Sequence, residues 1–90
     1  MRIDKFLKNS RLIKRRTVAK EMCEQGRVQL GGRPAKPGSE VEIGDVIEIR
    51  FGSVKLIIRV VAIHDTVKKE DADSMYELIE RAEIGESDDE

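Results

Sequence analysis

The stretch Arg11-Leu12-Ile13-Lys14-Arg15-Arg16-Thr17-Val18-Ala19-Lys20-Glu21-Met22-Cys23-Glu24-Gln25-Gly26-Arg27-Val28 decides the fold of this chain. It opens with four cations in six residues and then has the composition of a helix. Gly26 can adopt the left-handed conformation that ends a helix, and an alternating strand pattern begins at Val28. We interpret the stretch as a helix that presents a basic end to RNA phosphate, followed directly by a supporting strand.

The second half of this stretch has helical periodicity. Ala19, Met22 and Cys23 recur at three- and four-residue spacing, which places them on one apolar face. We expect a helix that starts at residue 16 or 17 and ends at residue 25, with this face against the core. The Thr17 hydroxyl is a candidate N-cap.

A shorter helix is expected before it. Asp4 is a plausible N-cap, and Phe6 and Leu7 are spaced from Ile3 so that the three form one apolar face. Asn9-Ser10 has the composition of a bend and should end this helix.

Strand signals follow the second helix. Residues 28–30 alternate, Gly31-Gly32 can form a tight hairpin turn, and the proline in residues 33–36 confines that arm to a sheet edge. Residues 46–51 and 54–63 read as two further strands around a second turn. Helices followed by antiparallel hairpins predict the α+β class.

The last third of the chain is acidic. We expect a helix over residues 71–82 and disorder over residues 85–90, which are almost entirely small or acidic. The division is therefore a basic domain over 1–63, a partly helical acidic extension over 64–84, and a tail. The expected helix rests on the helical spacing of Met75, Leu78, Ile79 and Ala82.

The net charge of −1 hides a strong segregation of charge. Residues 1–60 contain 14 Lys and Arg against 7 Asp and Glu, a net of +7, whereas residues 61–90 contain 3 against 11, a net of −8. This polarity is typical of a basic domain that meets a polyanion. With 3% aromatic residues and no Trp, readers of single strands that rely on aromatic stacking are disfavoured.

Composition also favours an intracellular protein. Cys23 is the single cysteine, so neither a disulfide framework nor a cysteine metal cluster can form within the chain. The chain begins with mixed charge rather than an apolar signal region. Its longest apolar run, residues 54–63, is interrupted by Lys55 and Arg59 and is shorter than the ~20 residues a membrane span needs. We expect a cytoplasmic protein without a membrane segment.

Catalytic patterns are weak. His64 and Asp65 are neighbours at a strand end, where side chains point to opposite faces, and Cys23 fits the buried face of a helix. The chain has no phosphate-binding glycine loop, dinucleotide fingerprint or zinc-protease motif. We expect a protein that is not an enzyme and needs no metal or cofactor.

The basic residues form the strongest functional signal. Residues 5–20 contain no acid, and a cluster of unneutralised cations repels itself unless an anionic partner binds it. RNA or another polyanion is therefore favoured over a merely solvated face, although charge alone does not separate RNA from DNA or an anionic membrane. The candidate RNA-binding residues are Arg2, Lys5, Lys8, Arg11, Lys14, Arg15, Arg16, Lys20 and Arg27.

Two segments together resemble the S4 RNA-binding domain. Residues 16–30 match its helix-glycine-strand core, residues 36–49 match its Gly-Asp turn into a strand, and the likeness covers residues 1–62. The family often has serine where Arg15 stands and Asn-Gly where Gly31-Gly32 stand, and neither departure threatens the fold. The resemblance implies two short helices packed on a small, mostly antiparallel sheet, with RNA against the exposed helix face.

A second resemblance spans nearly the whole chain. Residues 1–8, 10–17, 65–70 and 75–76 are similar to the RqcP family of stand-alone S4 proteins, which are relatives of heat-shock protein fifteen. The resemblance implies a role in ribosome-associated quality control on the large ribosomal subunit obstructed by peptidyl-tRNA. The implied partners are 23S rRNA, peptidyl-tRNA and an RqcH-type factor that adds alanine tails to the stalled peptide.

By the same likeness, Arg2 and Arg16 are expected to be leading RNA contacts. We also expect a monomer that does not bind DNA. Three alternatives stay open. The chain could rescue dissociated large subunits without tailing, as heat-shock protein fifteen does, or serve as a structural or assembly protein of the ribosome. It could also be the RNA-docking part of a modifying enzyme whose catalytic half is another chain.

Overall fold

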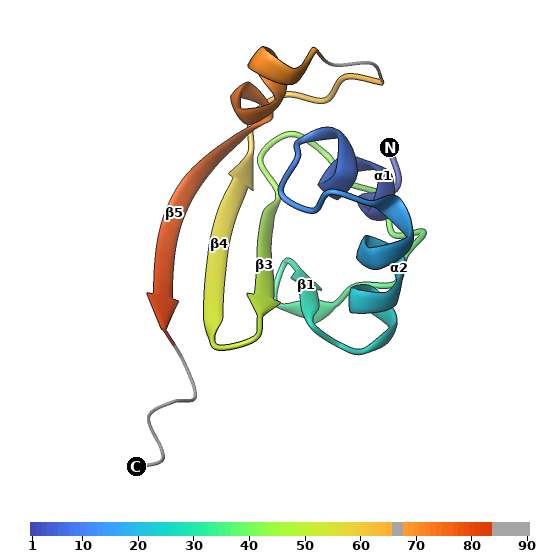
Figure 1. The fold of residues 1–90 in the computed structure, drawn as a ribbon, viewed down its shortest axis with the longest axis vertical. Helices are drawn as coiled ribbons and strands as arrows, with labels where there is room; N and C mark the ends of the chain where they lie inside the picture. Colours follow the sequence, from blue (N-terminus) through green and yellow to red (C-terminus); the bar gives the residue numbers. More distant parts are fainter. Residues whose placement is uncertain (66–67, 84–90) are drawn as a thin grey trace.

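Two short helices begin the fold and lie on one side of an antiparallel sheet (Figure 1). In the computed structural model, which describes residues 1–65 and 68–83, helix α1 spans Ile3–Asn9 and helix α2 spans Arg16–Glu24. The expected positions of both helices and the α+β class are confirmed.

The sheet has five strands in the spatial order β2-β1-β3-β4-β5, and every neighbouring pair is antiparallel. The first four strands follow the sequence expectations closely, whereas the last was not expected. The strands are β1 (Val28–Leu30), β2 (Arg33–Pro34), β3 (Val46–Phe51), β4 (Val54–Val60) and β5 (Tyr76–Glu83).

Glycines with positive φ make two changes of direction near the helices. Gly26 has a φ of 77° and ends α2, as expected for the left-handed residue after a helix. Gly31 and Gly32 have φ values of 61° and 84°, and a turn with two positive φ angles matches the twist of a two-residue hairpin. This hairpin joins β1 to β2, which lies at the sheet edge, where the missing N–H of Pro34 costs no ladder hydrogen bond.

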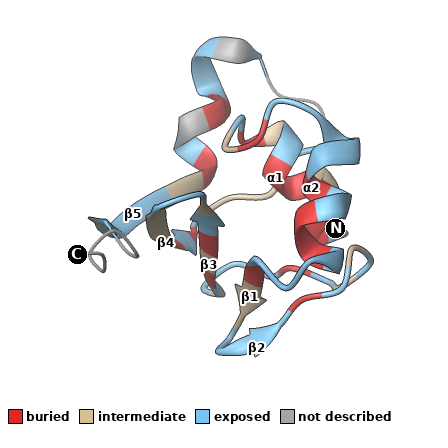
Figure 2. Cartoon of the chain, turned by 60° about the horizontal axis from the view of Figure 1, so that its bottom comes forward, coloured by how far each residue is buried: buried red, intermediate tan, exposed pale blue. Residues whose placement is uncertain are grey.

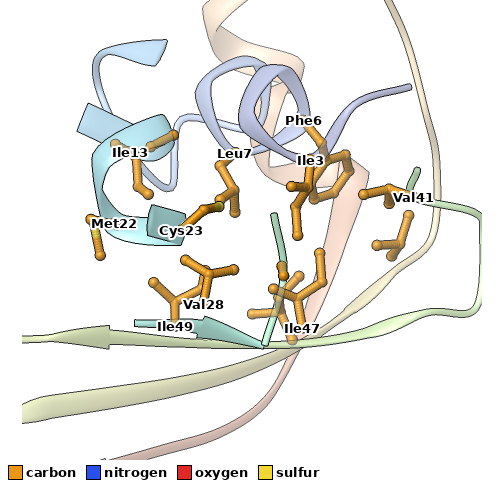
Figure 3. Packing of buried hydrophobic residues seen from close by; sticks show 14 of the residues in the cluster. Ile3, Phe6, Leu7, Ile13, Met22, Cys23, Val28, Val41, Ile47 and Ile49 are labelled. Carbon is orange, nitrogen blue, oxygen red and sulfur yellow. The ribbon is translucent and has the colours of Figure 1, made fainter. Parts of the chain in front are cut away.

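The hydrophobic core lies between the helices and the sheet (Figure 3). Phe6 and Leu7 of α1 and Ile47 and Ile49 of β3 are fully buried, and Ala19, Met22 and Cys23 of α2 lie in the same cluster. Burying one large aliphatic or aromatic side chain contributes roughly 1.5–3 kcal/mol. The apolar faces predicted for both helices are therefore the faces that hold them on the sheet.

The prediction of a helix over residues 71–82 is wrong. Residues 69–75 form a short 3-10 helix, η1 (Lys69–Met75), and the chain then continues as β5 along β4. The free edge of β4 offers backbone hydrogen bonds, whereas an isolated helix of this length is marginal in water. Tyr76 pairs with Val60 of β4, and Leu78, two residues later, pairs with Ile58. Both β4 residues are fully buried. The expected disorder of residues 85–90 lies outside the described residues.

The N-cap assigned to Asp4 is also wrong. Arg2 is the N-cap residue of α1 and makes no side-chain capping bond. The first N–H groups of α1 donate instead to a neighbouring loop, from Ile3 to the Ser39 carbonyl at 2.8 Å and from Asp4 to the Pro37 carbonyl at 3.3 Å. Because the loop satisfies these donors, the Asp4 carboxylate is free for another role.

Two further boundaries differ from expectation. Arg15, not Thr17, is the N-cap residue of α2, and it makes no side-chain capping bond. Strand β4 ends at Val60 rather than at residue 63, because the N–H groups of Val61 and Ala62 turn away and donate to the Met75 carbonyl of η1.

Candidate RNA interface

The predicted RNA-binding residues lie on both helices and on the segments beside them. Figure 2 shows that α1 and α2 are buried on the sides facing the sheet and exposed on the outside. Eight of the nine cations are exposed, and Lys5 is half-buried. The surface they form is called the basic surface below: Arg2, Lys5, Lys8, Arg11, Lys14, Arg15, Arg16, Lys20 and Arg27.

Asp4 brings the starts of the two helices together. Its Oδ2 atom lies 3.1 Å from Arg2 Nη2, and its Oδ1 atom lies 3.3 Å from Arg16 Nη2. The Asp4 side chain is 3% exposed, whereas the side chains of Arg2 and Arg16 are 51% and 46% exposed. One buried carboxylate thus lies beneath two arginines that still face solvent.

This arrangement has a clear energetic basis. A buried carboxylate without a cation is strongly unfavourable, so Asp4 requires at least one arginine beside it. Each guanidinium has five N–H donors, and contact with Asp4 leaves most of them available for phosphate or ribose oxygens. The ion pairs therefore hold the two guanidinium groups beside Asp4, Arg2 through a hydrogen bond and Arg16 through charge alone, and leave most of their N–H donors available to an anion.

The importance of Asp4 was missed from sequence. A signal for it exists, because Asp4 is the one acid among the first 20 residues. A lone acid within a basic segment is a candidate counter-ion for several cations. Its burial in the structure separates this role from that of a helix cap.

The remaining cations are less tightly grouped. Lys8 is exposed on α1, whereas Lys5 on the same helix forms an ion pair with Asp65 at 3.2 Å. Arg11, Lys14 and Arg15 are exposed residues of the connection between the helices, and Arg11 has a positive φ of 63°.

Lys20 and Arg27 lie along and beyond α2. Lys20 is one turn after Arg16 and exposed, as the four-residue spacing predicts. Arg27 lies past Gly26, at the opposite end of α2, where its carbonyl accepts a bond from the Arg50 N–H of β3. Of the nine residues, Arg2 and Arg16 share one carboxylate. Arg27 lies farthest along α2 from this pair.

Cys23 has the environment of a core residue rather than a nucleophile. It is buried among the apolar residues of α1 and the sheet (Figure 3). Burial, followed by the nearby carboxylates of Asp4 and Glu24, raises the pKa of its thiol from 9.0 to about 11. Because the thiolate is the reactive form, the thiol is unreactive at neutral pH.

The described residues contain no group of three or more His, Cys, Asp or Glu side chains placed to hold a metal ion. His64 and Asp65 are both exposed. Across residues 1–65 and 68–83, neither helix has the length and apolar character needed to cross a bilayer.

The S4 domain family model matches residues 1–47. The chain is 49% identical over 86 residues to the RQC P-site tRNA stabilizing factor of Bacillus subtilis, covering 96% of this chain and all of that protein. It is 47% identical over 87 residues to the factor of the same name from Streptococcus pneumoniae, with coverage of 97% and 99%.

A solved structure agrees with these relatives. The trimeric structure of Vibrio cholerae heat shock protein 15 has a TM-score of 0.82 at 35% identity, over 88% of this chain and 81% of that one. Both resemblances drawn from the sequence are confirmed. This chain belongs to the S4 domain family, together with the RQC P-site tRNA stabilizing factors that it matches over almost its whole length.

Proposed function

We propose that this protein is a non-catalytic RNA-binding factor of ribosome-associated quality control. The observation that carries the proposal is the arrangement of Arg2 and Arg16, which two helices of an S4 domain hold half-exposed above one buried carboxylate. The names of its relatives, which describe stabilisation of P-site tRNA, support RNA as the anion that this surface binds.

The physics of the basic surface favours a structured RNA. Each phosphate neutralised by lysine or arginine releases counterions, which supplies affinity without reading sequence. Helical RNA is recognised mainly through its shape, phosphates and 2′-hydroxyl groups, and fixed arginines suit such recognition better than mobile ones. Because Asp4 fixes two arginines at the junction of α1 and α2, the surface is preorganised for one arrangement of phosphates.

The proposed partners follow from the family. On the large ribosomal subunit obstructed by peptidyl-tRNA, the basic surface would contact both the tRNA and 23S rRNA. By holding the tRNA in place, the protein would support an RqcH-type factor that adds alanine tails to the stalled chain. The action is positional, so it requires cations in a fixed geometry and no catalytic group. The proposal places the protein in the cytoplasm, where ribosomes are.

The test is a salt titration of binding to large ribosomal subunits that carry peptidyl-tRNA. Arg16→Ala is expected to weaken binding and to reduce the slope of log affinity against log salt by roughly 0.7–0.9 for the lost phosphate contact. Arg50→Ala is the matched control, because Arg50 is also half-exposed and paired with an acid, Glu48, but lies on β3. An equal slope for wild type and Arg16→Ala would contradict the assignment.

Subunit rescue without tailing is the second candidate, and the similarity to heat shock protein 15 favours it. The two roles differ in their products. Under the first, deleting the gene removes alanine tails from stalled chains, whereas under the second the tails persist and obstructed subunits accumulate. Sucrose gradients separate both from a structural role in the ribosome, since a ribosomal or assembly protein would be found on every particle or every precursor.

We further propose that the protein acts as a monomer. The two sheet edges are poorly suited to pairing with another copy, because β2 contains Pro34 and β5 carries exposed charges and faces a register shift at Ile57/Ile58. The exposed charged residues of β5 are Glu77, Glu80, Arg81 and Glu83. Light scattering at micromolar concentration should give the mass of one chain, and a trimer would contradict this reasoning.

A further inference from the structure

A carboxylate from the distant end of the domain lies beside α1. Lys5 Nζ is 3.2 Å from Asp65 Oδ1. One turn further along the helix, the Asn9 side-chain amide donates to the carbonyl oxygens of His64 and Asp65, at 3.1 and 2.9 Å. Because Lys5 and Asn9 are four residues apart, they lie on one side of α1, and the 64–65 segment runs along that side.

Backbone contacts, rather than the ion pair, hold Asp65 in this place. On one side, the N–H groups of Val61 and Ala62 donate to the Met75 carbonyl at 2.9 and 3.2 Å, and the Met75 side chain is fully buried. On the other side, Asn9 binds the main chain of the segment itself. The Asp65 side chain, which is 84% exposed, is thus presented to Lys5 even though a surface ion pair contributes little by itself.

The two acids that form ion pairs with the basic surface, among the residues that the structure describes, differ in accessibility. Asp4 is buried below Arg2 and Arg16, where an incoming phosphate cannot meet it. Asp65 is exposed and pairs with Lys5 from outside the helix. A phosphate that approaches Lys5 has to displace the Asp65 carboxylate and is repelled by it after displacement.

We infer that Asp65 is an internal competitor for phosphate, which occupies Lys5 in the free protein and lowers the affinity of the basic surface for RNA. The inference rests on the proposed RNA-binding function. It adds that Asp65 sets the affinity for RNA although it does not touch the RNA in the bound state. Removing the competitor is expected to raise affinity by about two- to fivefold, the range of an exposed ion pair.

The first experiment compares two variants that each remove one negative charge. Asp65→Asn keeps the main-chain carbonyl that Asn9 binds, so the segment remains in place. Glu77→Gln is the matched control, since Glu77 is also exposed and ion-paired, to Arg59 at 3.0 Å on the sheet. Fluorescence anisotropy with labelled deacylated tRNA should show tighter binding for Asp65→Asn only. Equal affinities of the two variants would overturn the inference.

The second experiment asks whether the effect passes through Lys5. Lys5→Ala should reduce tRNA affinity more in the Asp65→Asn protein than in the wild type, by the same two- to fivefold factor, because only there is the ammonium free. Additive effects, or no effect of Lys5→Ala in the Asp65→Asn protein, would overturn the inference. Failure of the wild type to bind tRNA or large subunits at all would instead overturn the proposed function.

Discussion

Replacing Arg11 with glycine is expected to make this protein more stable and a weaker RNA binder. Arg11 follows Ser10, the C-cap residue of α1, and its φ of 63° is the one positive value outside glycine among the described residues. Its N–H donates to the Lys8 carbonyl at 3.0 Å, the pattern of the residue just past a helix end, where glycine is preferred.

The magnitude follows from the backbone. A residue with a Cβ in the left-handed conformation loses about 1–2 kcal/mol, and the greater freedom of glycine in the unfolded chain offsets about 0.5–1 kcal/mol of the relief. The Arg11 side chain is exposed, so its removal leaves no buried cavity. At the middle of these two ranges the free energy of unfolding should rise by about 0.75 kcal/mol, which corresponds to about 3–6 °C in Tm for a domain of this size.

The same substitution removes a cation from the basic surface. Strain at an exposed arginine is explained if that cation binds RNA, since functional sites are where such strain is tolerated. Loss of one charged contact should reduce affinity for tRNA about two- to tenfold and the log–log salt slope by about 0.7–0.9. Stability and binding are thus expected to move in opposite directions.

Thermal melting and filter binding at several salt concentrations measure the two effects. Arg11→Lys keeps both the strained Cβ and the cation, so its Tm and affinity should stay close to those of the wild type. A Tm that does not rise in Arg11→Gly would refute the strain argument. A higher Tm with unchanged tRNA affinity would refute the role of Arg11 in RNA binding.

Three further predictions concern charge and chain length. Asp4→Asn keeps the shape but not the charge beneath the arginines, so urea denaturation should show a loss of about 1–3 kcal/mol, and unchanged stability would contradict the ion pairs. The raised pKa of about 11 for Cys23 means that its contribution to stability is complete below pH 9 and is lost as pH rises toward 11. Cys23→Ala should remove that part of the alkaline decline, and identical declines would contradict it. Truncating residues 84–90, which contain four acids, should raise binding to random RNA in gel shifts without lowering Tm. Truncating residues 71–90 should unfold the domain, because it also deletes β5.

Local patterns were enough to predict the helices and the first hairpin. The three- and four-residue spacing of Ala19, Met22 and Cys23 identifies the buried face of α2, and Gly26 marks its end. These features depend on neighbours within one or two turns, so sequence carries them directly. The exposure of most of the basic surface follows from the same spacing, because residues between the apolar positions face outward.

The features that were missed depend on residues far apart in the chain. Asp4 has the residue type of an N-cap, but carbonyls of the 37–39 loop satisfy the first donors of α1 and leave its carboxylate to two arginines. Residues 76–83 have apolar spacing compatible with helix or strand, and the open edge of β4 decides between them. The contact between Lys5 and Asp65 spans 60 residues and forms where the segment that follows β4 passes along α1.

Under the proposed function, the depth of an acid below the surface decides how it affects the RNA binding of a neighbouring cation. Asp4 is buried, so it holds Arg2 and Arg16 from below and competes with no phosphate. Asp65 carries the same chemical group, but it is exposed and contacts Lys5 from the solvent side. Under the proposed function, the Asp4 carboxylate preorganises Arg2 and Arg16 for phosphate, whereas the Asp65 carboxylate keeps Lys5 from phosphate. Removal of the first should weaken RNA binding and removal of the second should strengthen it, although both substitutions add the same charge to the basic surface.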